Sequence, residues 1–342
     1  MAPHRRGDHR AQSPSPAQSP SRGGRVARLR RTLLAGLVAA AVAVPVAGAA
    51  RPVDVPAPAP APTVPLGSAT PAELTARYAA AREGLRAAER AADAYGAHRR
   101  AASLRRMAGP GRQFLSFDGR DGGRSVEAVG DLARADRIAV LVPGADTGPD
   151  SYGRFRAGAV ALEGTLRREL GARAAVVAWL GYRTPGTASA ASLTPGRADQ
   201  AAPGLRAFVE ELSAAKPRAR ITLLCHSYGS VVCARAASSL PAAAIVLYGS
   251  PGAAVDSVTD LDTPATVWAG RAANDWVADV PHLRLPLLPG SELGFGADPV
   301  DRAFGARHFA AGDGGHSDYL APGSVALDNL ARIVDGREPS RA

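Results

Sequence analysis

Short apolar runs and longer amphipathic segments alternate along the chain between residues 113 and 335. A continuous apolar run that ends near glycine or proline is typical of a strand buried on both faces of a parallel sheet. Five runs have this character: RIAVLVPG (137–144), AAVVAWLGY (174–182), ITLLC (221–225), AAIVLYGSP (243–251) and PATVWAG (264–270). Two shorter runs, QFLSFD (113–118) and SVEAVGD (125–131), predict a hairpin before them.

The segments between these runs have helical spacing. Helices are expected at 151–170, at about 197–215, at 228–239 and at 323–335, and a polar, glycine-rich region precedes the last of them. A repeated strand–helix order predicts an α/β fold with a mostly parallel central sheet and helices on both faces. Ligands of such sheets bind at the carboxyl ends of the strands, so the loops there are of most interest.

The chain before residue 111 has a different pattern. Residues 50–68 are rich in proline and alanine and are expected to form an extended linker. The stretch TPAE (70–73) combines a capping threonine, a proline at the first helical position and a glutamate that can close a capping box. We expect a helical segment at 69–110, either one long helix or a hairpin broken near Gly96, followed by the α/β domain at 111–338.

The longest apolar run, residues 32–50, follows an arginine-rich segment and ends in Ala47-Gly48-Ala49. This combination predicts a secretory signal peptide over 1–49 that is cut after Ala49, and the pair Arg30-Arg31 resembles a twin-arginine signal. The alternative is a retained membrane anchor, because the run is nearly long enough to span a bilayer. Either way the protein is expected to be secreted or otherwise extracytoplasmic.

Charge is concentrated in that same leader. The whole chain has a net charge of +10, but residues 1–51 hold nine arginines against one aspartate, which is +8 and leaves +2 for the rest. A nearly neutral body has no broad basic field for phosphate backbones. Nucleic acid is therefore excluded as the main partner.

The strand at 221–225 runs into CHSYG (225–229) and then into a helix. A serine hydroxyl becomes a nucleophile when a base activates it and a tight turn lifts it clear of the backbone. The signature of such a turn is G-x-S-x-G. Gly229 supplies the second glycine, whereas Cys225 stands in place of the first. This context predicts Ser227 as a nucleophile, and the alternative is a serine that caps an ordinary helix.

A base and an acid are expected after the serine, in the order acid then histidine. His316 lies in the glycine-rich loop GDGGHSDYL, which can bring an imidazole to the serine; His308 and His282 are the alternatives. An acid should orient the imidazole and stabilise its charged form.

Asp275 is the candidate acid, five residues beyond the strand at 264–270. Asp279 and Asp298 are alternatives, and Asp318 is expected to hold local loop structure.

Backbone N–H groups should stabilise a negatively charged oxygen in such a site. The candidates are the N–H of Ala145, which follows Gly144 in VPGADTG, and the N–H of Tyr228. Tyr182, at the end of WLGY, is expected to line the mouth of the site and bind substrate, and a core aromatic is the equal alternative.

The two cysteines, Cys225 and Cys233, lie on either side of Ser227. In an exported protein an even number of cysteines suggests a disulfide. The equal alternative is a pair of small buried apolar side chains.

The stretches VPGADT, AWLGY, CHSYGS, ANDWV, FGARHF and GGHSDYL resemble an actinobacterial family of exported α/β-hydrolases that is catalogued as a domain of unknown function. The similarity extends from about residue 113 to 335. It implies the α/β-hydrolase fold, the residue order serine, acid, histidine, and hydrolysis of carboxylic esters, but no particular substrate.

The sequence therefore predicts an exported serine hydrolase, esterase-like or lipase-like, that uses Ser227, Asp275 and His316 through an acyl-enzyme. The expected partner is a small-molecule or lipid ester, and the chemistry requires no metal or cofactor. The alternatives are a peptidase, thioesterase or acyltransferase acting on cell-envelope substrates, which would associate with the envelope, or a binding protein that keeps a hydrolase fold without turnover.

Overall fold

The computed structural model describes residues 55–341 except 61, 63–64 and 289–290. The chain divides into two units, residues 1–51 and 52–342, and all described residues belong to the second. The predicted signal peptide (1–49) and the start of the predicted linker (50–68) lie outside the described residues. No helix in the described part has the length and apolar character needed to cross a membrane.

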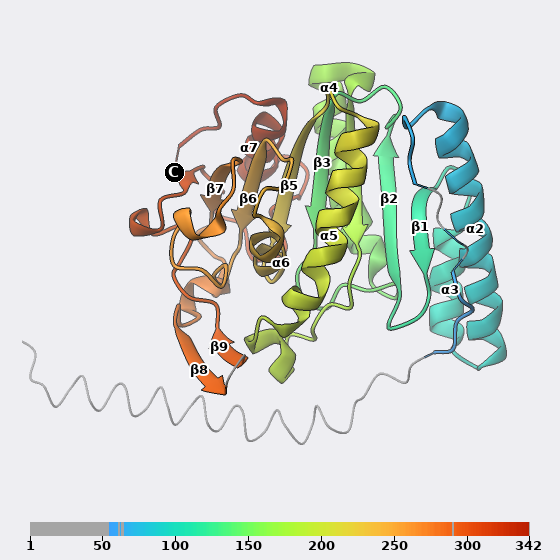
Figure 1. Cartoon of the computed structure of the whole chain (residues 1–342), viewed down its shortest axis with the longest axis horizontal. Coiled ribbons are helices and arrows are strands. Elements are labelled where there is room, and N and C mark those ends of the chain that lie inside the picture. Colours follow the sequence, from blue (N-terminus) through green and yellow to red (C-terminus); the bar gives the residue numbers. More distant parts are fainter. Residues whose placement is uncertain (1–54, 61, 63–64, 289–290, 342) are drawn as a thin grey trace, which may run out of the picture. The chain divides into compact units, whose positions relative to one another are not determined.

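An eight-stranded sheet runs through this unit in the order β1-β2-β4-β3-β5-β6-β7-β10 (Figure 1). The pairs β1–β2 and β2–β4 are antiparallel, and every later pair is parallel. The strands are β1 (Gln113–Asp118), β2 (Arg124–Gly130), β3 (Arg137–Val142), β4 (Ala174–Leu180), β5 (Arg220–His226), β6 (Ala244–Tyr248), β7 (Thr266–Gly270) and β10 (Arg307–His308).

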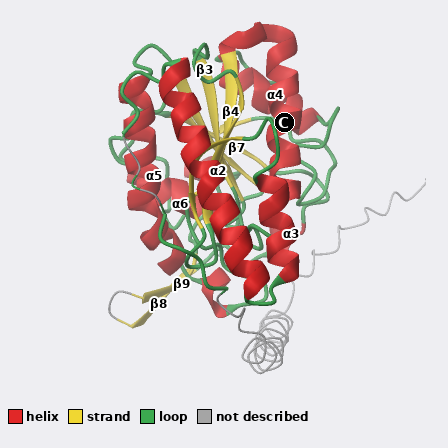
Figure 2. Ribbon diagram, turned by 90° about the vertical axis from the view of Figure 1, so that its right-hand side faces the viewer, coloured by secondary structure: helices red, strands yellow, loops and turns green. Residues whose placement is uncertain are grey.

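Helices cover both faces of the sheet, which explains why the central strands are apolar along their whole length (Figures 1 and 2). Along β3, Ile138 and Val140 pack with the helices of one face, whereas Ala139 and Leu141 pack with those of the other. The first face carries α5 (Gly196–Ala215) and α6 (Gly229–Ala236), and the second carries α4 (Tyr152–Leu170) and α7 (Val325–Asp335). The predicted fold class, α/β with a mostly parallel sheet, is confirmed.

The segment before the sheet folds as a helical hairpin, one of the two expected forms. Its helices are α2 (Pro71–Ala94) and α3 (His98–Met107), and the chain reverses at Gly96 with φ +82°. The capping box is present, since the N–H of Glu73 donates to Thr70 Oγ1 over 3.3 Å and the N–H of Thr70 donates to Glu73 Oε2 over 3.0 Å. Local chemistry therefore fixes where α2 begins.

This hairpin packs on β1 at the edge of the sheet (Figure 1). Leu85 of α2 is fully buried and belongs to one apolar cluster with Phe114 and Phe117 of β1. Just before α2, Leu66 is buried and its backbone N–H donates to Glu211 of α5 over 2.7 Å. The hairpin is thus joined to the sheet by a shared core.

The glycine-rich region between β7 and α7 contains short strands that the sequence did not reveal. β8 (Arg284–Leu288) and β9 (Ser291–Gly294) form a separate two-stranded hairpin. β10 adds only two residues to the edge of β7. Two residues are too few to show a period of two in the sequence, and their pairing depends on the neighbouring strand.

Candidate active site

The turn between β5 and α6 holds Ser227 in a left-handed backbone conformation, with φ +53°. Such a conformation costs a non-glycine residue about 1–2 kcal/mol, so the surroundings must impose it. The N–H of Ser227 donates to the carbonyl oxygen of Tyr248 at the end of β6, over 3.1 Å. This bond ties the serine to the carboxyl edge of the sheet.

Two glycines allow neighbouring segments to approach this turn closely. A Cβ on Gly229 would lie 2.5 Å from the carbonyl oxygen of Val142, and a Cβ on Gly144 would lie 2.6 Å from Cβ of Ser227. Any larger residue at either position would push α6 or the loop after β3 away from the serine. Gly229 is the glycine retained from the G-x-S-x-G pattern.

His316 lies between Ser227 and Asp275. Its Nε2 is 2.9 Å from Ser227 Oγ, and its Nδ1 is 2.8 Å from Asp275 Oδ1. A carboxylate can only accept, so Nδ1 carries the proton and Nε2 is left to accept from the serine hydroxyl. The loops that follow β5, β7 and β10 thus bring the three expected residues into one hydrogen-bonded chain.

Asp275 is buried, and burial by itself would raise the pKa of its carboxyl. Hydrogen bonds from His316, from the Tyr319 hydroxyl at 2.5 Å and from the N–H of Val277 at 2.9 Å outweigh burial and lower that pKa. Asp275 is therefore ionised at neutral pH. Burial, and next the bond to Asp275, raise the pKa of Tyr319, which keeps its proton and remains a donor.

Sequence reasoning missed Tyr319. It lies three residues after His316 in the same loop, and its hydroxyl also accepts the N–H of Ala272 over 3.0 Å. The only signal was this spacing within GGHSDYL, and a tyrosine there is equally compatible with an ordinary core position.

His226 is the second residue that sequence reasoning left out of the site. Its Nε2 donates to the carbonyl oxygen of His316 over 2.8 Å, and the two rings lie 4.6 Å apart. Burial, and next the neighbouring His316, lower the pKa of His226 to about 3, so it is neutral at physiological pH. His226 therefore holds the backbone of the His316 loop through this hydrogen bond and adds no charge to the site.

Ala145 and Tyr228, the two expected backbone donors, line the same cavity as Ser227. Within the described part of the chain, neither the N–H of Ala145 nor that of Tyr228 has an acceptor. The Tyr228 side chain is held in place, because its hydroxyl donates to the carbonyl oxygen of Thr194 over 2.7 Å and accepts the N–H of Ala198 over 3.2 Å. A fixed side chain keeps the adjoining backbone N–H fixed as well.

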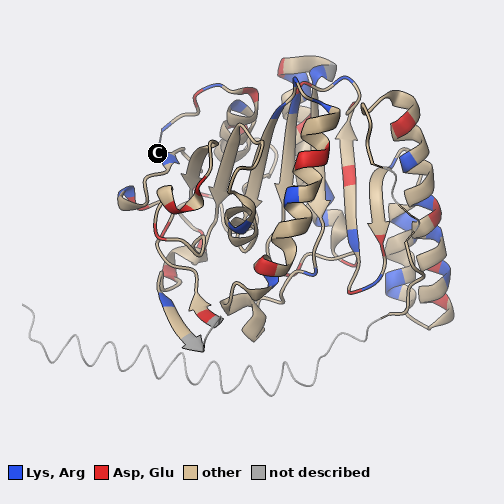
Figure 3. Cartoon of the chain, viewed as in Figure 1, with Lys and Arg blue, Asp and Glu red and all other residues tan. Residues whose placement is uncertain are grey.

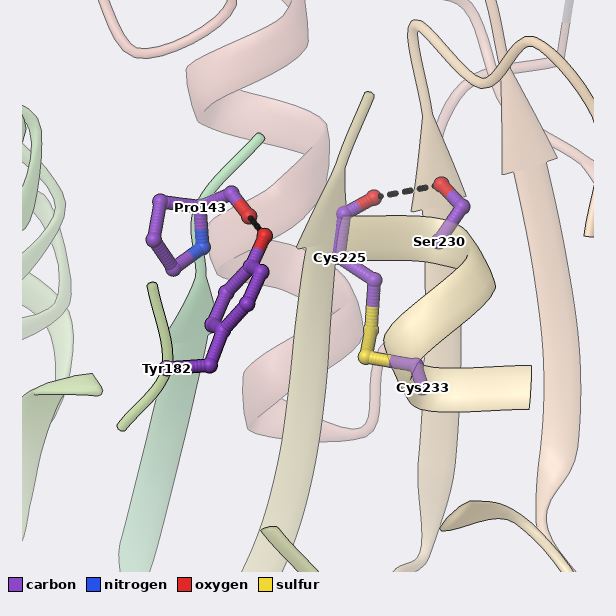
Figure 4. Close-up of a disulfide and its surroundings, with 5 residues drawn as sticks. All are labelled: Pro143, Tyr182, Cys225, Ser230 and Cys233. Atoms are coloured by element: carbon purple, nitrogen blue, oxygen red, sulfur yellow. Dashed lines mark hydrogen bonds between the residues drawn. A yellow bond between two sulfur atoms is a disulfide. The ribbon is translucent and has the colours of Figure 1, made fainter. Parts of the chain in front are cut away.

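Of the two readings of Tyr182, a residue that lines the mouth of the site or a core aromatic, the structure has the core aromatic. Its side chain is buried, stacks on Trp179 and donates to the carbonyl oxygen of Pro143 over 2.7 Å (Figure 4). It does not line the cavity that contains Ser227. The side chain points inward because its ring packs in the core beside Trp179. Its hydroxyl bonds to Pro143, at the start of the loop that contains Ala145.

Cys225 and Cys233 form a disulfide between the end of β5 and the second turn of α6 (Figure 4). Both residues are fully buried. Ser230 adds a second link across the turn, because its hydroxyl donates to the carbonyl oxygen of Cys225 over 3.1 Å. Of the two readings of the cysteine pair, the structure has the disulfide, and Ser227 lies inside the short loop that it closes.

A cavity of about 780 Å³ opens in front of Ser227. Its walls are mostly apolar, and Trp276, half exposed, lies with its ring 4.7 Å from that of His316. The other large apolar side chains of the lining are Phe155, Leu193, Val280, Phe295 and Leu320. A pocket of this size and character suits a small ligand with an apolar portion.

A family model described as alpha/beta hydrolase matches residues 118–285. Residues 118–285 of the chain thus belong to the α/β-hydrolase superfamily. The matched residues begin at the end of β1 and include Ser227 and Asp275. The superfamily predicted from the motifs is thereby confirmed, and it makes the protein a hydrolase in broad class.

Solved structures with a similar chain trace include proteins described as hydrolases or esterases. They include an α/β serine hydrolase without a lid from Xanthomonas campestris (21% identity, 67% of this chain and 94% of that chain, TM-score 0.41). Esterase PE8 has 17% identity over 62% of this chain and 98% of its own, with a TM-score of 0.42. Esterase LipW from Mycobacterium marinum has 13% identity over 73% and 88%, with a TM-score of 0.38. Among curated proteins, none matches the sequence.

We expect the protein with the disulfide to be more stable than variants without it. Cys225→Ala with Cys233→Ala should lower the free energy of unfolding in urea by about 2.5 kcal/mol, because the cross-link no longer restricts the unfolded chain. Either single substitution already breaks the bond, so each should cost nearly as much as the pair. Strictly additive losses, or a change below about 0.5 kcal/mol, would contradict a stabilising cross-link.

Proposed function

We propose that this hydrolase is a serine carboxylesterase that acts through an acyl-enzyme. The observation that carries the proposal is the chain of hydrogen bonds from Ser227 through His316 to Asp275. Among side chains at the floor of the cavity, the serine hydroxyl is the one group with a base aligned on it and an acid aligned on that base.

In the proposed reaction, Ser227 Oγ attacks the ester carbonyl carbon while its proton passes to His316 Nε2. Asp275 stabilises the resulting imidazolium through the Nδ1–H bond and is not itself protonated. The tetrahedral intermediate then collapses, the bond to the alcohol oxygen breaks, and His316 gives the proton to the leaving alcohol. A water molecule, deprotonated by His316 in turn, releases the acid and restores the serine.

The negative charge on the carbonyl oxygen would be stabilised by the N–H groups of Ala145 and Tyr228. Donors already fixed in place need no reorganisation as the charge develops, and each is worth about 3 kcal/mol in related sites. Tyr182 and the Tyr228 hydroxyl support this role indirectly, since each holds the backbone from which one N–H projects.

Replacing the nucleophile tests the proposal directly. Ser227→Ala should reduce kcat for short and medium p-nitrophenyl esters by at least about 10³-fold, because the acyl-enzyme no longer forms. A fluorophosphonate probe should label the wild-type protein and Ser238→Ala, a control in the turn that follows α6, but not Ser227→Ala. Undiminished turnover in Ser227→Ala would overturn the proposal, and a wild type that neither labels nor turns over would indicate a binding protein.

Tyr319 is proposed as a positioning residue for Asp275. Tyr319→Phe removes one of three bonds to the carboxylate and should lower kcat about tenfold with KM unchanged, a cost of about 1.4 kcal/mol. Tyr78→Phe, at a partly buried tyrosine of α2 outside the site, serves as the control. A rise in KM at constant kcat would instead assign Tyr319 to substrate binding.

We also propose that the enzyme acts outside the cytoplasm. The basic and apolar leader supports this, and so does the disulfide, since disulfides persist in oxidising compartments. The protein recovered from outside the cell should begin at Ala50 when its N-terminus is sequenced. A chain that still begins at Met1 and stays in the membrane fraction would instead support a retained anchor.

A further inference from the structure

A smaller hollow lies next to the cavity in front of Ser227. It has a volume of about 450 Å³, and both spaces are lined by Ser151 and Arg154. Its other walls come from α3, from the loop between α3 and β1, and from the first turn of α4. The helical hairpin, whose role the sequence left open, thus lines a space that lies next to the proposed active site.

Four arginines line this hollow: Arg106, Arg112, Arg154 and Arg156. We call it the arginine hollow. α3 alone carries four arginines and no acidic residue (Figure 3). The one acidic residue in the lining, Asp150, is already engaged by Arg100 through bonds of 2.7 and 2.9 Å.

One buried carboxylate accepts hydrogen bonds from two of these arginines. Glu127 of β2 accepts two bonds from Arg112, at 2.5 and 2.8 Å, and one from Arg156, at 3.2 Å. The Tyr152 hydroxyl also donates to it over 3.0 Å. Glu127 therefore balances one of the four positive charges and fixes the guanidinium groups of two arginines, leaving an excess of three.

Two of the arginines have no acidic partner in the described part of the chain. Arg106 donates to the hydroxyl of Ser103 over 2.8 Å, and Arg154 forms no ion pair. Both are exposed, and Arg154 lies where the hollow meets the cavity. The amino end of α4, which begins at Tyr152, adds the partial positive charge of the helix dipole.

We propose that the arginine hollow binds an anionic group of the substrate, so that the esters cleaved are anionic amphiphiles. The apolar cavity would take the acyl chain, and the alcohol portion would carry a phosphate or a carboxylate into the hollow. Guanidinium groups bind either anion through paired hydrogen bonds. This inference rests on the proposed esterase function and adds the substrate class to it.

Three matched substrates test the inference with the full chain: octanoyl-glycerol, octanoyl-glycerol 3-phosphate and octanoyl-glyceric acid. The kcat/KM of at least one anionic ester should exceed that of the neutral ester at least tenfold, mainly through KM. The preferred anion distinguishes phosphate from carboxylate. Raising the salt concentration should reduce this preference, because exposed charges are screened.

The double variant Arg106→Gln with Arg154→Gln should bring the ratio of anionic to neutral kcat/KM close to one. The control is Arg167→Ala. Arg167 is an exposed arginine of α4 that pairs with Glu163, and its replacement should leave the ratio as in the wild type. Because the readout is a ratio within one protein, a partial loss of folded enzyme does not change it.

Equal or better hydrolysis of the neutral ester by the wild type would overturn the inference, as would a preference that survives the double variant. Either result leaves the esterase proposal intact. A protein that cleaves none of the three esters and is not labelled by a fluorophosphonate would instead overturn the proposed function itself.

Discussion

The left-handed backbone at Ser227 is the constraint on which the rest of the site depends. A residue with a side chain avoids this conformation unless its neighbours impose it, and here several do so together. The N–H bond to Tyr248 holds the turn against the sheet, Gly229 and Gly144 let the backbones approach, and the disulfide closes the turn from below. The result is a hydroxyl that projects from the end of β5 toward the neighbouring loops.

The parallel sheet supplies the second condition, because it collects the ends of its strands along one edge. Ser227 follows β5, Asp275 follows β7, and His316 comes from the loop beyond β10. Each loop is anchored separately, by the disulfide for the first, by the bond that the N–H of Val277 donates to Asp275 for the second, and by His226 for the third. Hydrogen-bond distances between residues far apart in the chain are thus maintained by several local restraints.

The two buried carboxylates that matter most for this protein are satisfied in the same way. Asp275 and Glu127 are both buried carboxylates, and each accepts several hydrogen bonds that offset the loss of water. Asp275 faces a histidine and a tyrosine, which suits proton transfer, whereas Glu127 faces two arginines, which suits the fixing of positive charge. The difference between the two sites lies in the donors that surround each carboxylate.

The sequence by itself determined the order of the strands from β1 to β7 and of the helices between them, the start of α2 and the position of the turn at Ser227. These features depend on periodicity, caps and glycines, which are local signals. It also suggested Asp275 and His316 from their place in loops after strands. Tertiary structure decided the inward direction of Tyr182, the contacts of Tyr319 and His226, the pairing of β10 and the arginine hollow. These depend on which distant segments meet across the sheet, and no local pattern records such contacts.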